Sequence, residues 1–388
     1  MLDDDILEAM AGWRHDLHAH PETAFTELRT SDLVARELTI SGFSVHRGLA
    51  GTGVVGTLVT GPGPAIGLRA DMDALDIGEL GTLPYVSRHA GKMHACGHDG
   101  HTAMLLGAAR HLARTRGFAG TLHVIFQPAE ENEGGGRRMI EEGLFDRFPC
   151  QEIFGLHNWP GTPLGRFAVN RATMMASFDT FEIVVTGRGC HGAMPETGVD
   201  PIVPAAAIVT GFQSIVSRKI GAMEKAVVSV TQIHGGDTWN VIPDSVTLRG
   251  TARCMTPAVQ DAIERHLGAL AQGIAEAHGA VADVRYHRRY PATINDPRAA
   301  DKAAVAAAMV AGREGVTTDC LPSMASEDFG FMLERVPGAY IFMGVGDAGH
   351  QAALHNPHYD FNDAALGLGA AYWVRLVEHV LAPAGTGG

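Results

Sequence analysis

The side chains best suited to chemistry gather in one short segment, residues 93–101. This segment reads MHACGHDGH and contains three histidines, one cysteine and one aspartate within eight residues. Thiolate, imidazole and carboxylate are the ligands that zinc-like metals prefer. The Cys-x-His spacing of Cys96 and His98 lets both side chains reach one ion, so the segment predicts a metal site just before a helix. A polar helix N-terminus with incidental histidines is the alternative.

Two adjacent glutamates, Glu130 and Glu131, follow the apolar run TLHVIFQ at residues 121–127, which predicts a strand. In α/β folds, functional side chains gather at the carboxyl ends of strands. Two neighbouring carboxylates repel each other unless a cation holds one of them. The pair therefore fits one metal ligand and one general base. Taken alone, it also fits a solvated acidic loop.

Three further segments place polar side chains beside predicted strands or apolar runs. In RADMDA, the carboxylates of Asp71 and Asp73 share one face of an extended chain, although an ion pair with Arg69 that stabilises a turn explains them equally well. His157 in LHNWP and His355 in LHNP each stand before a turn that contains proline. Each of these two histidines fits a metal ligand or a structural role.

The composition limits the classes of function. The chain has 388 residues, with 30 Lys+Arg against 43 Asp+Glu and a net charge of −13, which argues against nucleic acid or an anionic membrane as the main partner. The 20 histidines fit metal chemistry. Five scattered cysteines favour a reducing compartment over a disulfide framework. Without a signal-peptide pattern or a long apolar run, we expect a cytoplasmic protein.

Strands and helices alternate near both ends of the chain, which predicts a discontinuous three-layer α/β domain over residues 1–176 and 292–388. Between them, residues 177–291 follow the order β-α-β-β-α-β, the ferredoxin-like pattern of a separate inserted domain. The expected helices cover residues 6–17, 31–41, 102–114, 204–217, 258–278 and 297–311. The expected strands cover residues 53–60, 65–70, 121–127, 178–186, 226–234, 245–254, 282–288 and 338–345.

The motifs RADMDA, MHACGHDGH, QPAEE, LHNWP and LHNP occur in this order. Through them, the chain resembles the aminoacylase/carboxypeptidase metallopeptidase family. More closely, it is similar to the amidohydrolase branch of hippurate hydrolases, N-acyl-amino-acid deacylases and auxin-conjugate hydrolases. The similarity extends from residue 17 to residue 362. It implies a metallo-exopeptidase-like α/β catalytic domain and an inserted domain that serves as a lid and for dimerisation.

The resemblance also implies a site for two divalent metal ions per subunit, of zinc, manganese, cobalt or nickel. The implied ligands are Cys96, His98, Glu131, His157 and His355. Glu130 is implied as the general base, which takes a proton from a water that bridges the metals and passes it to the leaving amine. Asp73 is implied to orient a metal ligand, and Asp71 has no assigned role.

In the inserted domain, the resemblance implies that His191 stabilises the oxyanion, in this family often from the partner subunit of a dimer. Asn240 and Arg253 are implied to hold the substrate, and an arginine suits a free carboxylate. An ordinary turn and a surface arginine are the alternatives. Glu327 also matches the family, with a role that stays open. The early histidines are expected to support the site without binding metal: His15, His18 and His20.

Together these residues predict a hydrolase that cleaves the amide bond of N-acyl-L-amino acids, with a small-molecule substrate and neither nucleic acid nor membrane as a partner. The resemblance implies a homodimer, or a tetramer, formed through the inserted domain. The alternatives are a dipeptidase or carboxypeptidase of the same fold, a cysteine amidase that uses Cys96, and a metal- or ligand-binding protein with an inactive site. The acyl group, the amino acid and the metal stay open.

Overall fold

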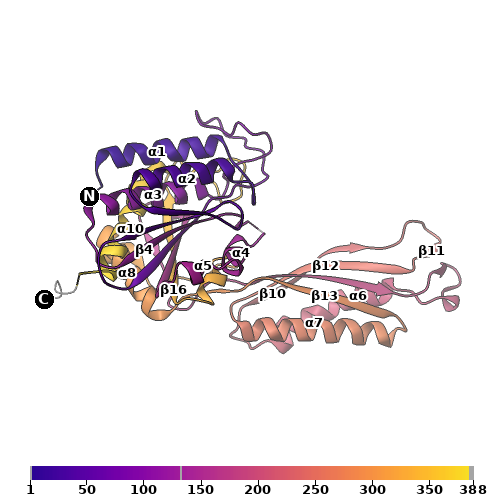
Figure 1. The fold of residues 1–388 in the computed structure, drawn as a ribbon. Coiled ribbons are helices and arrows are strands. Elements are labelled where there is room, and N and C mark those ends of the chain that lie inside the picture. The colour runs from indigo at the N-terminus through magenta and orange to yellow at the C-terminus, as the bar shows by residue number, and fades with distance from the viewer. Residues whose placement is uncertain (1, 132, 384–388) are drawn as a thin grey trace. The chain divides into compact units, whose positions relative to one another are not determined.

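The chain forms two compact units in a computed structural model that describes residues 2–131 and 133–383 (Figure 1). The first unit contains the chain up to Met174, Ile294–Leu321 and the chain from Asp328; the second contains Met175–Thr293 and Pro322–Glu327. The sequence analysis expects Pro322–Glu327 in the discontinuous α/β domain. In the structure, the contacts of this segment group it with the second unit.

An eight-stranded mixed sheet forms the centre of the first unit. Its strands, in spatial order, are β1 (Ser44–Leu49), β2 (Gly53–Val59), β4 (Thr121–Gln127), β3 (Ala65–Asp71), β5 (Glu152–Pro163), β16 (Gly338–Gly346), β6 (Phe167–Ala168) and β15 (Val316–Thr317). The four central strands β4, β3, β5 and β16 run parallel and are mostly buried, as expected for strands covered on both faces. Their carboxyl ends therefore meet at one edge.

Eight α-helices of the described chain surround this sheet. They are α1 (Asp4–Ala19), α2 (Leu28–Ile40), α3 (His98–Thr115), α4 (Gly135–Glu141), α5 (Leu144–Arg147), α8 (Pro297–Ala311), α9 (Gly330–Leu333) and α10 (Leu366–Val380). Helix α3 packs on β3 and helix α8 on β16, while α10 packs against both helices. Short 3₁₀ turns cover Arg313–Gly315 and Asp363–Ala365. None of the described helices has the length and apolarity needed to cross a bilayer.

Helix α3 begins earlier than the sequence predicted. Its first residue is His98, so His98 and His101 lie in its first turn, whereas His94 and Cys96 precede it. The prediction that the whole segment stands before the helix is therefore wrong. The apolar period identified only the part from residue 102, because the first turn buries polar side chains instead of apolar ones.

The second unit is a four-stranded antiparallel sheet with two helices (Figure 1). Its strands are β8 (Phe178–Thr186), β10 (Ala226–His234), β12 (Ser245–Cys254) and β13 (Val281–Tyr290), in the spatial order β10-β12-β8-β13. Helix α6 (Ile202–Ser214), a π-turn at Ile215–Lys219 and helix α7 (Pro257–Ala277) bury one face of the sheet in a shared apolar core. This is the predicted β-α-β-β-α-β order.

Short strands complete the described elements. In the second unit, β9 (Cys190–His191) pairs with β11 (Val241–Ile242), next to a 3₁₀ turn at Pro195–Thr197. Strands β7 (Thr173–Met175) and β14 (Thr293–Ile294) lie where the chain passes from one unit to the other and back.

Candidate metal centre

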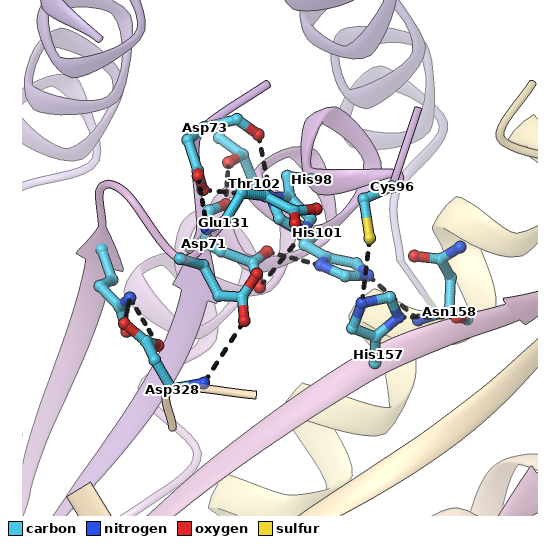
Figure 2. Close-up of polar contacts among 12 residues, drawn as sticks. Asp71, Asp73, Cys96, His98, His101, Thr102, Glu131, His157, Asn158 and Asp328 are labelled. Carbon is cyan, nitrogen blue, oxygen red and sulfur yellow. Dashed lines mark hydrogen bonds and ion pairs between the residues drawn. The ribbon is translucent and has the colours of Figure 1, made fainter. Parts of the chain in front are cut away.

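Thiol, imidazole and carboxylate groups converge in the first unit, beyond the carboxyl ends of its parallel strands (Figure 2). Within each of three groups, the potential ligand atoms lie within 4.8 Å of one another. The groups are Cys96–His98–His157, Cys96–Glu131–His355 and His98–Glu130–Glu131. Because they share Cys96, His98 and Glu131, they form one contiguous cluster. The structure therefore brings together all five predicted ligands and the predicted base.

A tight turn at Gly97 sets the direction of Cys96 and His98. Gly97 has a φ of +88°, a left-handed conformation that favours glycine. A Cβ atom there would lie 2.6 Å from Oδ1 of Asn158 and 2.7 Å from the hydroxyl of Tyr359. This turn leaves Sγ of Cys96 3.5 Å from Nε2 of His157. Glycine is thus required both by the backbone and by the lack of space.

Hydrogen bonds fix the tautomers of the two buried histidines. Nδ1 of His98 donates to Asp73, with its carbonyl oxygen at 2.9 Å and Oδ1 at 3.2 Å. Nδ1 of His157 donates to the carbonyl oxygen of Asn158 at 2.7 Å. Both rings consequently offer Nε2 to the cluster, and Nε2 of His98 is buried without a hydrogen bond among the described residues. Such a nitrogen is costly to bury, and a metal ion would satisfy it.

The loop after β4 positions the two glutamates differently. The backbone N–H of Glu131 donates to Oδ2 of Asp73 at 2.9 Å, so Asp73 contacts both His98 and Glu131. Oε1 of Glu131 lies 3.0 Å from Nε2 of His355 without hydrogen-bond geometry. Oε1 of Glu130 instead accepts the N–H of Asp328 at 3.3 Å. Glu131 therefore faces the ligand atoms, and Glu130 is fixed by a separate contact.

The electrostatics of the cluster favour a cation. Burial, Glu131 and Glu130 hold the pKa of the Cys96 thiol well above its usual range. Burial lowers the pKa of His98, but the carboxylates of Asp71 and Asp73 outweigh it and raise this pKa to about 10. A divalent cation reverses both effects, because it binds thiolate and neutral imidazole and displaces their protons. The donor set therefore fits a metal site.

A second buried network of hydrogen bonds lies next to the cluster. Oδ2 of Asp71 accepts a hydrogen bond from Nη1 of Arg69 at 2.6 Å. Its Oδ1 accepts one from Nδ1 of His101 at 2.6 Å (Figure 2). Nε2 of His101 accepts the backbone N–H of Asn158 at 3.0 Å. The network thus extends from Arg69 to the residue that follows His157. Sequence reasoning gave Asp71 and His101 no role.

One signal in the sequence could have identified His101: it stands three residues after His98, on the same face of a helix. In the structure, these two imidazoles stack with ring centres 5.4 Å apart. Burial raises the pKa of Asp71, but the neighbouring His98, Arg69 and His101 outweigh it and hold that pKa well below its usual range. Asp71 is therefore a buried, ionised carboxylate.

The early histidines lie outside the cluster of ligand atoms. Nδ1 of His18 lies 2.8 Å from Oδ2 of Asp99, and its Nε2 lies 3.2 Å from Oε1 of Glu79. Burial lowers the pKa of His18, but these two hydrogen bonds outweigh it and raise the pKa to about 9. His15 and His20 hydrogen-bond to other residues of the first unit. All three histidines thus have structural partners.

The residues implied for substrate contact lie in the second unit and form two separate groups. His191 and Asn240 are exposed neighbours, since β9 pairs with β11 and the N–H of Gly192 donates to the carbonyl oxygen of Asn240 at 2.8 Å. They lie near the first residue of β12, because Asp244 accepts the N–H of Gly189. Arg253 lies near the other end of β12.

At ~3.3 Å per residue, the eight residue steps from Ser245 to Arg253 along β12 span ~26 Å. Arg253 donates from Nη1 to the carbonyl oxygen of Met324 at 3.1 Å, and its guanidinium lies 4.8 Å from the ring centre of Phe178. The structure therefore does not bring Arg253 together with His191 and Asn240 within one second unit.

The chain is similar to known proteins over most of its length. The family model described as Peptidase family M20/M25/M40 matches residues 67–379. The chain is 41% identical over 364 residues to hippurate hydrolase of Campylobacter jejuni, covering 94% of each chain. It is 37% identical over 386 residues to N-acetylcysteine deacetylase of Bacillus subtilis, covering 98% of this chain and 99% of that protein.

Among solved structures, the chain is similar to a dinuclear metal-binding peptidase of the M20 family from Bacillus subtilis. The TM-score is 0.87 at 34% sequence identity, and the match covers 98% of this chain and 99% of the other. This likeness confirms the α/β fold class that the sequence predicted.

Proposed function

Because this chain belongs to peptidase family M20/M25/M40, we propose that it is a metal-dependent amidohydrolase of N-acyl-L-amino acids. Its products are a carboxylic acid and a free amino acid. The observation that carries this proposal is the cluster itself: a buried thiol, two imidazoles with fixed tautomers and two adjacent glutamates that face different partners. The names of the two relatives above supply the class of substrate.

We assign two divalent cations to this site, with these protein ligands: Cys96, His98, Glu131, His157 and His355. Two ligand triads share Cys96, which fits two neighbouring ions. When bound, the ions supply positive charge that activates a water molecule and polarises the amide carbonyl. Zinc, manganese, cobalt and nickel all accept such mixed ligands.

Glu130 is the general base in this proposal. Its neighbour Glu131 faces His355, whereas Glu130 is held by the N–H of Asp328. The carboxylate of Glu130 takes one proton from the attacking water as the new C–O bond forms. It then delivers this proton to the amide nitrogen as the C–N bond breaks, so the amine leaves neutral. Asp73 orients His98 and Glu131 during these steps.

His191 is assigned to stabilise the oxyanion, and Asn240 and Arg253 to hold the substrate. Because ~26 Å along β12 separate Arg253 from the other two, one substrate molecule cannot contact all three residues of one chain. Two chains together can provide both groups at one site. We therefore assign a homodimer in which the second unit of each chain contributes His191 and Asn240 to the site of its partner.

The second unit also offers a surface for such pairing. Among the described strands of this sheet, β10 pairs only with β12, and the side chains of Val227 and Ile233 on β10 are exposed. An open strand edge pairs readily with another chain, and in this proposal the occupant is a second copy. The cytoplasm is the assigned compartment, because all five cysteines are free thiols.

A substrate screen tests the reaction. Acetyl, benzoyl, succinyl and indole-acetyl conjugates of several amino acids, together with simple dipeptides, are incubated with metal-loaded enzyme, and the released amino acid is measured. We expect release from acyl conjugates that a chelator abolishes and added metal restores. Chelator-resistant activity that thiol alkylation destroys would instead identify a cysteine amidase, although burial and the raised pKa of Cys96 disfavour a reactive thiolate.

Mixing two inactive variants tests the dimer. A heterodimer of Glu130→Gln and His191→Ala contains one site with native Glu130 and, from the other chain, native His191. We expect the mixture, after subunit exchange, to regain up to about half of the activity per heterodimer. If His191 serves the site of its own chain, every site carries one defect and no activity returns. Light scattering on each variant confirms that the mixed species are dimers.

A further inference from the structure

A buried carboxyl group with no part in the proposed reaction lies behind the loop that carries Glu130 and Glu131. Glu27 is fully buried at the start of helix α2. Its Oε1 accepts the backbone N–H of Phe25 and of Ala129, both at 3.0 Å, and its Oε2 accepts the hydroxyl of Thr52 at 2.6 Å. Three donors from three segments of the first unit therefore meet on one side chain.

Ala129, which immediately precedes Glu130, has an unusual backbone conformation. Its φ is +53°, in the left-handed region that alanine disfavours. Besides its N–H bond to Glu27, its carbonyl oxygen accepts the N–H of Gly135 at 2.9 Å. Gly135 has no room for a side chain, because a Cβ there would lie 1.8 Å from the carbonyl oxygen of Pro128. Both the N–H and the carbonyl oxygen of Ala129 are thus held by hydrogen bonds.

The same oxygen of Glu27 holds a second left-handed residue, Phe25, whose φ is +61°. One carboxyl oxygen therefore ties two unfavourable backbone turns to each other. Residues in such conformations persist when their surroundings over-determine them, and they gather at functional sites. Here, Ala129 immediately precedes Glu130 and Glu131, the two glutamates of the proposed site.

We infer that Glu27 is a positioning residue, which holds Ala129 in its left-handed conformation and so aims Glu130 and Glu131 at different partners. This inference rests on the proposed hydrolase function. Burial outweighs the Thr52 hydrogen bond and raises the pKa of Glu27 to about 7. The acceptor oxygen of Glu27, rather than its charge, is therefore the property that the loop needs.

Three substitutions test this inference by steady-state kinetics. Glu27→Ala removes the acceptor, and we expect kcat to fall at least tenfold while KM changes less than threefold. Glu27→Gln keeps an acceptor oxygen, and we expect its kcat within threefold of the native value. Ala129→Gly removes the backbone penalty of the left-handed turn, so adding it to Glu27→Ala should raise kcat again.

Glu142→Ala is the matched control. Glu142 also accepts the backbone N–H of a left-handed alanine, Ala50, at 2.6 Å. Ala50, however, lies outside the loop that carries Glu130 and Glu131. Its kcat should stay within threefold of native. If Glu27→Ala does not accumulate as a soluble protein, Thr52→Val provides a milder perturbation, with a smaller kcat loss that Ala129→Gly reverses. A soluble Glu27→Ala enzyme with native kcat, or one that Ala129→Gly fails to improve, overturns the inference.

Hydrogen–deuterium exchange separates this inference from the proposed function, because it requires no substrate. The loop from residue 127 to residue 136 should exchange faster in Glu27→Ala and return towards native protection when Ala129→Gly is added. An unchanged exchange rate in Glu27→Ala overturns the positioning role. A native protein that hydrolyses no acyl amino acid, yet shows the expected exchange, contradicts the proposed function alone.

Discussion

Replacing Asp71 by asparagine preserves the shape of the side chain and removes its charge. Both carboxylate oxygens of Asp71 accept hydrogen bonds at 2.6 Å, one from Arg69 and one from His101. An asparagine side chain has only one acceptor oxygen, so in either orientation its NH₂ group faces another donor. The substitution therefore creates a donor–donor contact next to a buried arginine.

The size of the effect follows from the burial of these partners. Arg69 and Asp71 are both almost completely buried, so the ion pair is shielded from water. A hydrogen bond to a charged group contributes about 1.5–3 kcal/mol, and breaking a buried ion pair by removing one partner costs about 3–5 kcal/mol. Because Asp328 still pairs with Arg69 at 3.0 Å, we expect the free energy of unfolding to fall by about 3–4 kcal/mol.

Urea denaturation of metal-free native protein and of Asp71→Asn measures this loss, with Asp32→Asn as the control. Asp32 also pairs with an arginine, Arg47, but both side chains are exposed, so its substitution should have little effect. The folded-state pKa of Asp71 lies below its unfolded value. The stabilisation is therefore complete above about pH 4 and is lost progressively as the pH falls. Equal unfolding free energies for Asp71→Asn and native protein at pH 7 would refute this reasoning.

Three further outcomes are expected. Glu130→Gln should lower kcat roughly 10²- to 10⁴-fold while elemental analysis finds the native metal content; native turnover would contradict its assignment as the base. Gly97→Ala should destabilise the protein by about 1–3 kcal/mol more than Gly91→Ala, because both glycines have positive φ but only Gly97 lacks space for a Cβ; equal melting temperatures would contradict this. Removing metal with a chelator should lower the melting temperature, and added zinc, manganese or cobalt should restore it. A melting temperature that the chelator does not change would argue against the metal site.

The local part of the site could be predicted from the sequence. Cys96, His98, Glu130 and Glu131 stand in two short segments, and their spacing alone suggested a ligand pair and a glutamate pair. The role of Asp73 depends on contacts with residues 25 and 58 positions away. The network of Asp71 likewise depends on the meeting of β3, α3 and β5. No periodicity in the sequence describes such contacts, because only the packing of the sheet creates them.

Helix α10 shows why a regular element can escape prediction. Its sequence contains Gly367 and Gly369, and glycine weakens a helix pattern. A Cβ at Gly369 would lie 2.0 Å from Sδ of Met104 in α3, so tight packing between the two helices requires this glycine. Tertiary contact thus selected a residue that the local signal disfavours. Strand β5, which carries His157, was missed in a similar way because polar and proline residues interrupt its apolar run.

The two ligand triads that share Cys96, namely Cys96–His98–His157 and Cys96–Glu131–His355, differ in their contact with solvent. Cys96, His98 and His157 are all buried, whereas the side chain of His355 is 51% exposed and belongs to a loop residue with a φ of +62°. Opening this loop requires far less of the fold to move than opening the buried triad does. We therefore expect unequal metal exchange: an ion at the His355 side leaves within a short dialysis, while its neighbour stays. Purified protein would then contain about one tightly held ion per chain.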